Sequence, residues 1–140
     1  MKKFKYIIVG GGMTGSSAAM EIRKHDTDGS IAMFSKEKFG PYNRPPLTKG
    51  LWTGKKLSEI TRNVEKYDVT LYLNCSITKI NRKAKTITDQ QGSSYQYEKL
   101  LIATGGSPVH LPDSPEGVIY YRRISDYEKL HQLVQIKSDF

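Results

Sequence analysis

Three glycines near the start of the chain have the spacing of a phosphate-binding turn. Residues 6–15 read YIIVGGGMTG, so Gly10, Gly12 and Gly15 fit the pattern G-x-G-x-x-G. The first glycine of such a turn permits a tight bend, the second lets a pyrophosphate approach the backbone, and the third lets a helix pack closely. The pattern therefore predicts dinucleotide binding at the N-terminus of a helix.

The elements that must position this turn are those of a βαβ unit. Apolar strands are expected over residues 5–9 and 31–34, with a helix over residues 16–24 between them. This order, completed in about thirty residues, has the proportions of the βαβ motif. Side chains available for the inner face of the helix are those of Ala18, Ala19 and Ile22.

An acidic residue should follow the second strand. The fingerprint places an acid about 20 residues after the last glycine, where it holds a ribose hydroxyl. Glu37 stands 22 positions after Gly15, but Lys36 precedes it and displaces the acid by one position. The strand before the turn, the helix after it and the acid after the second strand together favour a dinucleotide site over a purely structural turn.

The segment RPPLTK places two cations on a stiff loop. Arg44 and Lys49 flank two prolines, which lower the entropy lost when the segment is ordered. Arg44 can donate two parallel hydrogen bonds to an anionic cofactor. A solvated basic loop explains the composition equally well.

The second half of the chain predicts strands and one further helix. Alternating and β-branched residues over 69–98 predict a small antiparallel meander, and KLLI predicts a buried strand ahead of the glycine turn ATGG. A helix is expected to begin at a capping box in which Ser125 precedes Glu128 by three residues.

Composition narrows the class of protein. The 140 residues suit one domain, and the formal net charge of +8 favours acidic partners such as nucleotides. Cys75 is the only cysteine, which excludes an internal disulfide and a CxxC redox pair. The three histidines have no metal-ligand spacing, so no metal site is predicted. No apolar run approaches a membrane span, and we expect a cytoplasmic protein.

Four segments together resemble the FAD-containing pyridine nucleotide oxidoreductases, in the branch of ferredoxin and rubredoxin reductases and apoptosis-inducing factor. They are IIVGGGMTGSSAA, PYNRPPLTKGLW, YEKLLIATGGSP and IYYRRISDYEKL, and their order matches along nearly the whole chain. The resemblance implies an α/β, Rossmann-like, three-layer FAD-binding domain over residues 1–140, with a small antiparallel β-meander. It also implies that NAD-binding and interface domains are missing from this chain.

The resemblance implies a set of cofactor-binding residues. They are Gly10, Gly12, Met13, Thr14, Gly15, Lys36, Glu37, Arg44, Lys49, Ile77, Ala103, Thr104, Gly105 and Arg122. The glycine turn would hold the pyrophosphate, Glu37 with the Lys36 backbone would hold the ribose, and the Ile77 backbone would meet the adenine. Lys49 would approach flavin N5 and is the one catalytic residue expected. Family members usually carry an acid where Lys36 stands, so this position departs from the pattern.

The function implied is electron transfer from NADH or NADPH, through FAD, to a ferredoxin, a rubredoxin or another acceptor. Residues 40–42 read GPY, without the cysteines of the disulfide reductases, so a dithiol reaction is not expected. The isolated chain is expected to be inactive. The alternative is a non-catalytic nucleotide- or nucleic-acid-binding module. Binding of nucleic acid would rest on the positive net charge alone. Assembly into a homo-oligomer is left open by the sequence.

Overall fold

The computed structural model describes residues 1–136, which divide into two units. The first unit comprises residues 1–42 and 61–105, and the second comprises residues 43–60 and the described residues from 106 onward. All six strands belong to the first unit, as does α1. The second unit contains short helical turns and the C-terminal helix α3.

Within residues 1–136 the structure describes six strands, three α-helices and three 3-10 turns. The strands are β1 (Lys2–Val9), β2 (Ile31–Phe34), β3 (Val69–Tyr72), β4 (Ile77–Asn81), β5 (Thr86–Asp89) and β6 (Ser94–Ile102). The α-helices are α1 (Met13–His25), α2 (Leu57–Ile60) and α3 (Ile124–Ile136). Single 3-10 turns cover Pro45–Thr48, Gly50–Thr53 and Glu65–Tyr67.

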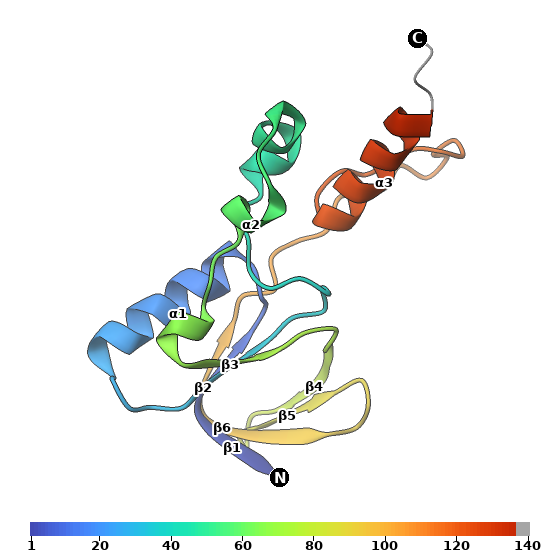
Figure 1. Ribbon diagram of the computed structural model, residues 1–140. Coiled ribbons are helices and arrows are strands. Elements are labelled where there is room, and N and C mark those ends of the chain that lie inside the picture. Colours follow the sequence, from blue (N-terminus) through green and yellow to red (C-terminus); the bar gives the residue numbers. More distant parts are fainter. Residues whose placement is uncertain (137–140) are drawn as a thin grey trace. The chain divides into compact units, whose positions relative to one another are not determined.

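The first unit is built on one mixed sheet in the order β3-β2-β1-β6-β5-β4 (Figure 1). Strands β3, β2, β1 and β6 run parallel, whereas β4, β5 and the start of β6 form an antiparallel meander. Helix α1 connects β1 to β2. The predicted α/β class with an added antiparallel part is confirmed.

Two apolar clusters cover the two faces of the parallel strands. On one face Ile8 and Met33 pack with Ala19 of α1. On the other face Val9 and Phe34 pack with Ile87 of the meander. Side chains of a strand alternate between faces, so a strand buried on both sides must be apolar throughout, as IAMF of β2 is. The result is a helix layer, a parallel sheet and an antiparallel layer.

The structure corrects two strand predictions. Residues 69–72 were predicted in the meander, but β3 pairs in parallel with β2, and Val69 is buried beside Ile31 on the helix face. KLLI was predicted as a separate buried strand, but it is the end of β6, where Ile102 is 59% exposed. Strand β5 pairs with β6 only over Ser94–Gln96. In the described part of the chain, the rest of β6 therefore has a neighbouring strand on one side only, which is β1.

The helix boundaries differ from the predicted ones. Helix α1 begins at Met13, three residues early, so Gly15 lies in its first turn. Helix α3 begins at Ile124, which places Ser125 inside the helix and not at the predicted N-cap. The Asp126 carboxylate instead accepts the N–H groups of the two preceding arginines, at 2.8 and 2.7 Å. Lys137, the last residue of the segment SDYEKLHQLVQIK in which this helix was expected, lies outside the described residues.

A carboxylate just after α1 joins the helix to β1. Asp26 Oδ2 lies 2.6 Å from Lys5 Nζ and accepts the Tyr6 hydroxyl at 2.8 Å, while Oδ1 accepts the Gly29 N–H at 2.8 Å. The bond from the Lys5 ammonium, followed by those from Tyr6 and Gly29, holds the pKa of Asp26 well below its usual range.

Replacement of Asp26 by Asn should therefore weaken the fold above pH 5 and flatten its acid response. A depressed pKa means that the ionised carboxylate stabilises the fold above its unfolded pKa of about 4, and that this stability is lost as the pH falls through the folded pKa. Urea denaturation at several pH values measures the slope. Asp28→Asn, at an exposed position two residues on, is the matched control. An unchanged pH slope in Asp26→Asn would contradict this role.

Within residues 1–136, no helix combines the length and the apolar character needed to cross a membrane.

Candidate dinucleotide-binding site

The carboxyl ends of β1, β2 and β6 meet at one edge of the sheet. The Gly10 N–H donates to Phe34 O at 2.8 Å, and the Ala103 N–H donates to Val9 O at 2.7 Å. From β1 the chain proceeds to β2 on one side, whereas β6 pairs on the other side, so the strand order reverses beside β1. In open α/β sheets, ligands bind outside the carboxyl ends of the strands at such a reversal.

Two glycines of the fingerprint are required by the protein itself. Gly10 has a φ of +125°, and a Cβ atom there would collide with the backbone of Ala103. A Cβ atom at Gly15 would collide with the carbonyl oxygen of Gly10. The first glycine therefore lets β1 turn against the end of β6, and the third lets α1 pack onto the turn.

Gly12 has no such requirement. A Cβ atom at this position would meet no protein atom within 4 Å. Its backbone, with φ −99° and ψ −166°, is extended and open to any residue. A side chain here would instead fill the space in front of the helix N-terminus, where the fingerprint places the pyrophosphate. The geometry of the turn thus fits a dinucleotide.

The N-terminus of α1 is free of a side-chain cap. Gly12 is the N-cap residue, it makes no side-chain cap bond, and the first turn contains no acidic residue. The first N–H groups of a helix have no intrahelical acceptor, and they carry the positive end of the helix dipole. Met13 and Thr14 are exposed, and the binding of a pyrophosphate by their N–H groups stays a prediction.

The segment after β2 lies against the glycine turn. Ser35 is buried, and a Cβ atom on Gly11 would lie 2.7 Å from Ser35 Oγ. Sequence reasoning missed this contact. The signal was the middle glycine of GGG, which the fingerprint leaves unspecified. Lys36 follows with an exposed side chain, whereas Glu37 is half-buried and accepts the Tyr42 hydroxyl at 2.7 Å.

The backbone also brings the predicted adenine contact to this edge. Cys75 N–H donates to Ser35 O at 2.8 Å, and Asn74 N–H donates to Glu37 O at 3.1 Å. These bonds hold the segment that enters β4 at Ile77 beside the residues predicted for the ribose. Burial, with the nearby Asp89 carboxylate, raises the pKa of the Cys75 thiol, which disfavours a reactive thiolate.

The predicted segment after β6 completes the edge. Ala103 is half-buried, and its carbonyl oxygen faces Gly10. Thr104 and Gly105 are exposed, and Gly105 has a φ of +67°, a left-handed conformation that favours glycine. The first unit contains most of the predicted set. Its members are Gly10, Gly12, Met13, Thr14, Gly15, Lys36, Glu37, Ile77, Ala103, Thr104 and Gly105.

The second unit carries the other three predicted residues. Arg44 Nη1 donates to the carbonyl oxygen of Arg122 at 2.9 Å, so these two lie together. Lys49 is exposed. Its N–H donates to Pro46 O at 3.1 Å, and its carbonyl oxygen accepts the Trp52 N–H at 3.0 Å.

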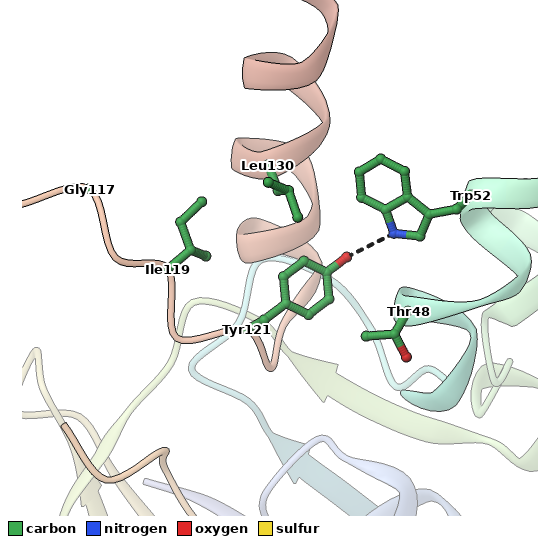
Figure 2. Close-up of a pocket in the computed structure, with 6 residues that line it drawn as sticks. All are labelled: Thr48, Trp52, Gly117, Ile119, Tyr121 and Leu130. Atoms are coloured by element: carbon green, nitrogen blue, oxygen red, sulfur yellow. Dashed lines mark hydrogen bonds between the residues drawn. The ribbon is translucent and has the colours of Figure 1, made fainter. Parts of the chain in front are cut away.

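The second unit contains a pocket of about 540 Å³ (Figure 2). One of its lining residues is Thr48, which directly precedes Lys49. Trp52 Nε1 donates to the Tyr121 hydroxyl at 3.3 Å, and that hydroxyl donates to Leu47 O at 2.7 Å. The lining residues are Thr48, Trp52, Gly117, Ile119, Tyr121 and Leu130. The sequence analysis did not predict this pocket, because residues some 70 positions apart form it.

No group of three His, Cys, Asp or Glu side chains in the described part of the chain could hold a metal ion.

Comparison with known proteins identifies relatives over nearly the whole chain. Monodehydroascorbate reductase 1, peroxisomal, of Arabidopsis thaliana is 31% identical over 98% of this chain and 37% of its own length. Rubredoxin-NAD(+) reductase of Pseudomonas putida is 34% identical over 90% of this chain and 35% of its own. The chain thus spans little more than a third of the curated relatives it matches.

A solved structure shows the same fold. The NADH:rubredoxin oxidoreductase of Clostridium acetobutylicum superposes with a TM-score of 0.81 and 26% identity, over 97% of this chain and 37% of that one. The profile of the family described as pyridine nucleotide-disulphide oxidoreductase matches residues 4–137. This family uses FAD and a pyridine nucleotide, as the sequence analysis expected. The match spans nearly all of the sequence, and the chain belongs to the pyridine nucleotide-disulphide oxidoreductase family.

Proposed function

We propose that this chain is the FAD-binding portion of an oxidoreductase that takes electrons from NADH or NADPH. The cofactor would pass them to a ferredoxin- or rubredoxin-like acceptor. The observation that carries the proposal is the open space at Gly12, between two glycines that the protein itself requires. That space faces an uncapped helix N-terminus at the reversal of the strand order.

Two relatives support the choice of donor and acceptor. One is named as a reductase that couples rubredoxin to NAD(+), and the solved neighbour is named as an NADH:rubredoxin oxidoreductase. The net charge of +8 would suit an acidic acceptor protein. Cytoplasmic localisation is part of the same proposal, although one relative is named as peroxisomal. Fluorescence of the tagged protein in its own cell would decide the compartment.

The test uses the natural full-length protein. Purified from its own cells, it should show the visible absorption of a flavin, which NADH or NADPH should bleach under anaerobic conditions. A reduced ferredoxin or rubredoxin should then appear when that acceptor is added. A colourless protein that cannot be loaded with FAD, and whose binding to DNA falls with salt, would overturn the proposal in favour of the nucleic-acid-binding alternative.

In the proposed enzyme, Lys49 tunes the flavin electrostatically. Bound FAD supplies the redox chemistry, and the protein supplies position and charge. The two backbone hydrogen bonds at Lys49 fix the origin of its side chain, while the ammonium group remains exposed. A fixed cation beside a group that gains negative charge stabilises the charged form.

Lys49→Met in the full-length protein should lower the midpoint potential of the bound flavin by about 30 mV, corresponding to a tenfold change for a two-electron couple. Spectroelectrochemical titration measures the shift. Lys56→Met, which removes another exposed lysine of the same unit, should leave the potential where it was. Equal potentials in the parent and Lys49→Met, at equal FAD content, would exclude a lysine close to the flavin ring.

A further inference from the structure

The pocket of the second unit is lined by apolar and aromatic surface without a charged group. Its volume of about 540 Å³ lies in the range of sites that hold small molecules. All of its lining residues belong to the second unit, and none of them is in the predicted cofactor-binding set. The proposed function therefore leaves this pocket without a role.

The polar atoms of the lining side chains are already bonded within the protein. Trp52 Nε1 donates to Leu47 O at 2.9 Å and to the Tyr121 hydroxyl at 3.3 Å, and Figure 2 shows the latter bond. The Tyr121 hydroxyl donates its own hydrogen to Leu47 O at 2.7 Å. Burial raises the pKa of that hydroxyl above its ordinary value, so the phenol stays neutral. The Thr48 hydroxyl donates to Pro45 O at 3.4 Å, which leaves the lining side chains no hydrogen to donate to a ligand.

Contacts with α3 fix the Trp52 ring in addition to its hydrogen bonds. The Tyr127 ring meets it edge-on, with the centroids 5.3 Å apart and the planes at 75°, and the His131 ring lies 5.7 Å away. A side chain that is held before binding loses little entropy when a ligand arrives. Even so, 38% of Trp52 stays exposed, and an apolar ligand would remove such surface from water.

We propose that this pocket binds a small, planar and uncharged aromatic molecule. The rings of Trp52 and Tyr121 favour a planar ring as partner, through offset stacking or edge-to-face contacts. Ile119 and Leu130 add aliphatic surface, which favours an apolar ligand. A charged ligand is disfavoured, because burial of a charge is costly where no lining side chain can pair with it. The site is formed by the second unit alone and does not require FAD.

The experiment uses Trp52 as its reporter, because it is the only tryptophan of the chain and lines the pocket. Nitrobenzene, a neutral planar quencher, is titrated into the chain, and the intensity and lifetime of the fluorescence are measured. The intensity should fall along a saturable curve with a Kd on the order of 1 mM, and far more than the lifetime. The anion 4-nitrobenzoate carries the same ring and should bind at least tenfold more weakly, although the net charge of +8 attracts it.

A pair of variants locates the site. Ile119→Asp places a carboxylate in the lining and should weaken the binding of nitrobenzene at least tenfold. Val118→Asp is the matched control, since it makes the same change of charge at the neighbouring residue, which is 46% exposed and does not line the pocket. It should bind nitrobenzene like the parent. The comparison of the two ligands uses the parent alone, so it decides the matter even where a variant fails to fold.

Three results would overturn the proposal. An intensity that falls linearly, with a lifetime that falls in proportion, would show only collisions with an exposed indole. Binding of 4-nitrobenzoate as tight as that of nitrobenzene would show attraction by a basic protein and not an apolar site. Equal affinities in the parent and a folded Ile119→Asp would place the ligand elsewhere. The proposed function stands in each case, because the glycine turn and this pocket share no residue.

Discussion

Gly12→Val should reduce the affinity for ADP and FAD at least 100-fold and leave the fold intact. Apart from its chain neighbours, no protein atom lies within 4 Å of a Cβ atom at this position, and the backbone is extended, so we expect the fold to accept a side chain here. Its methyl groups would occupy the space in which a pyrophosphate must approach the N–H groups of α1. Loss of two or more such bonds, each worth about 1.5 kcal/mol or more to a charged group, gives that factor.

The measurement is ADP titration by calorimetry, with circular dichroism and urea denaturation on the same samples. The change in the free energy of unfolding should stay within about 1 kcal/mol, the cost of a poorer N-cap residue. Gly40→Val is the matched control, because Gly40 lies outside the fingerprint and a Cβ atom there would meet only Leu71 Cδ2, at an ordinary 3.5 Å. A folded Gly12→Val protein that binds ADP like the parent would remove the pyrophosphate site from this turn.

Gly15→Ala, unlike Gly12→Val, should destabilise the fold itself, by about 2–3 kcal/mol. At an exposed helical site the same change gains about 1 kcal/mol, because alanine is the better helix former. Here the new methyl group would collide with the carbonyl oxygen of Gly10 and lie 3.2 Å from Ile8 Cγ2. The backbone of Gly10 is held by its bond to Phe34 O, so strain of the size seen in overpacked cores outweighs the gain in propensity.

Urea denaturation of the parent and the variant measures this loss. Gly40→Ala is the control in the same unit, since its methyl group would meet only Leu71 Cδ2, at an ordinary 3.5 Å. It should change the free energy of unfolding by less than about 0.5 kcal/mol. Unchanged or increased stability in Gly15→Ala would mean that α1 can move away from the turn. The contrast with Gly12 separates the glycine required by the ligand from the glycine required by the protein.

The local sequence determined the βαβ unit and the position of its glycine turn. Hydrophobic runs, helical periodicity and glycine spacing are local signals. The apolar run YIIV of β1, three spaced glycines and a helix with Ala19 on its inner face define the unit without distant partners. The family could be predicted for a related reason, because four motifs in order are far more specific than one. The cofactor-binding roles of individual residues, those of the glycine turn included, stay predictions.

Only the tertiary structure decided which strands pair and which glycines the protein needs. Residues 69–72 alternate like a meander strand, and their parallel pairing with β2 depends on burial of Val69 against residues more than thirty positions earlier. The same holds for the site. Gly10 and Gly12 are the same residue type, yet a Cβ atom on Gly10 would collide with Ala103 and one on Gly12 would face open space. The difference arises because β6 pairs with β1, which brings Ala103 next to Gly10. Contacts between residues distant in sequence have no local pattern, so only the folded chain shows them.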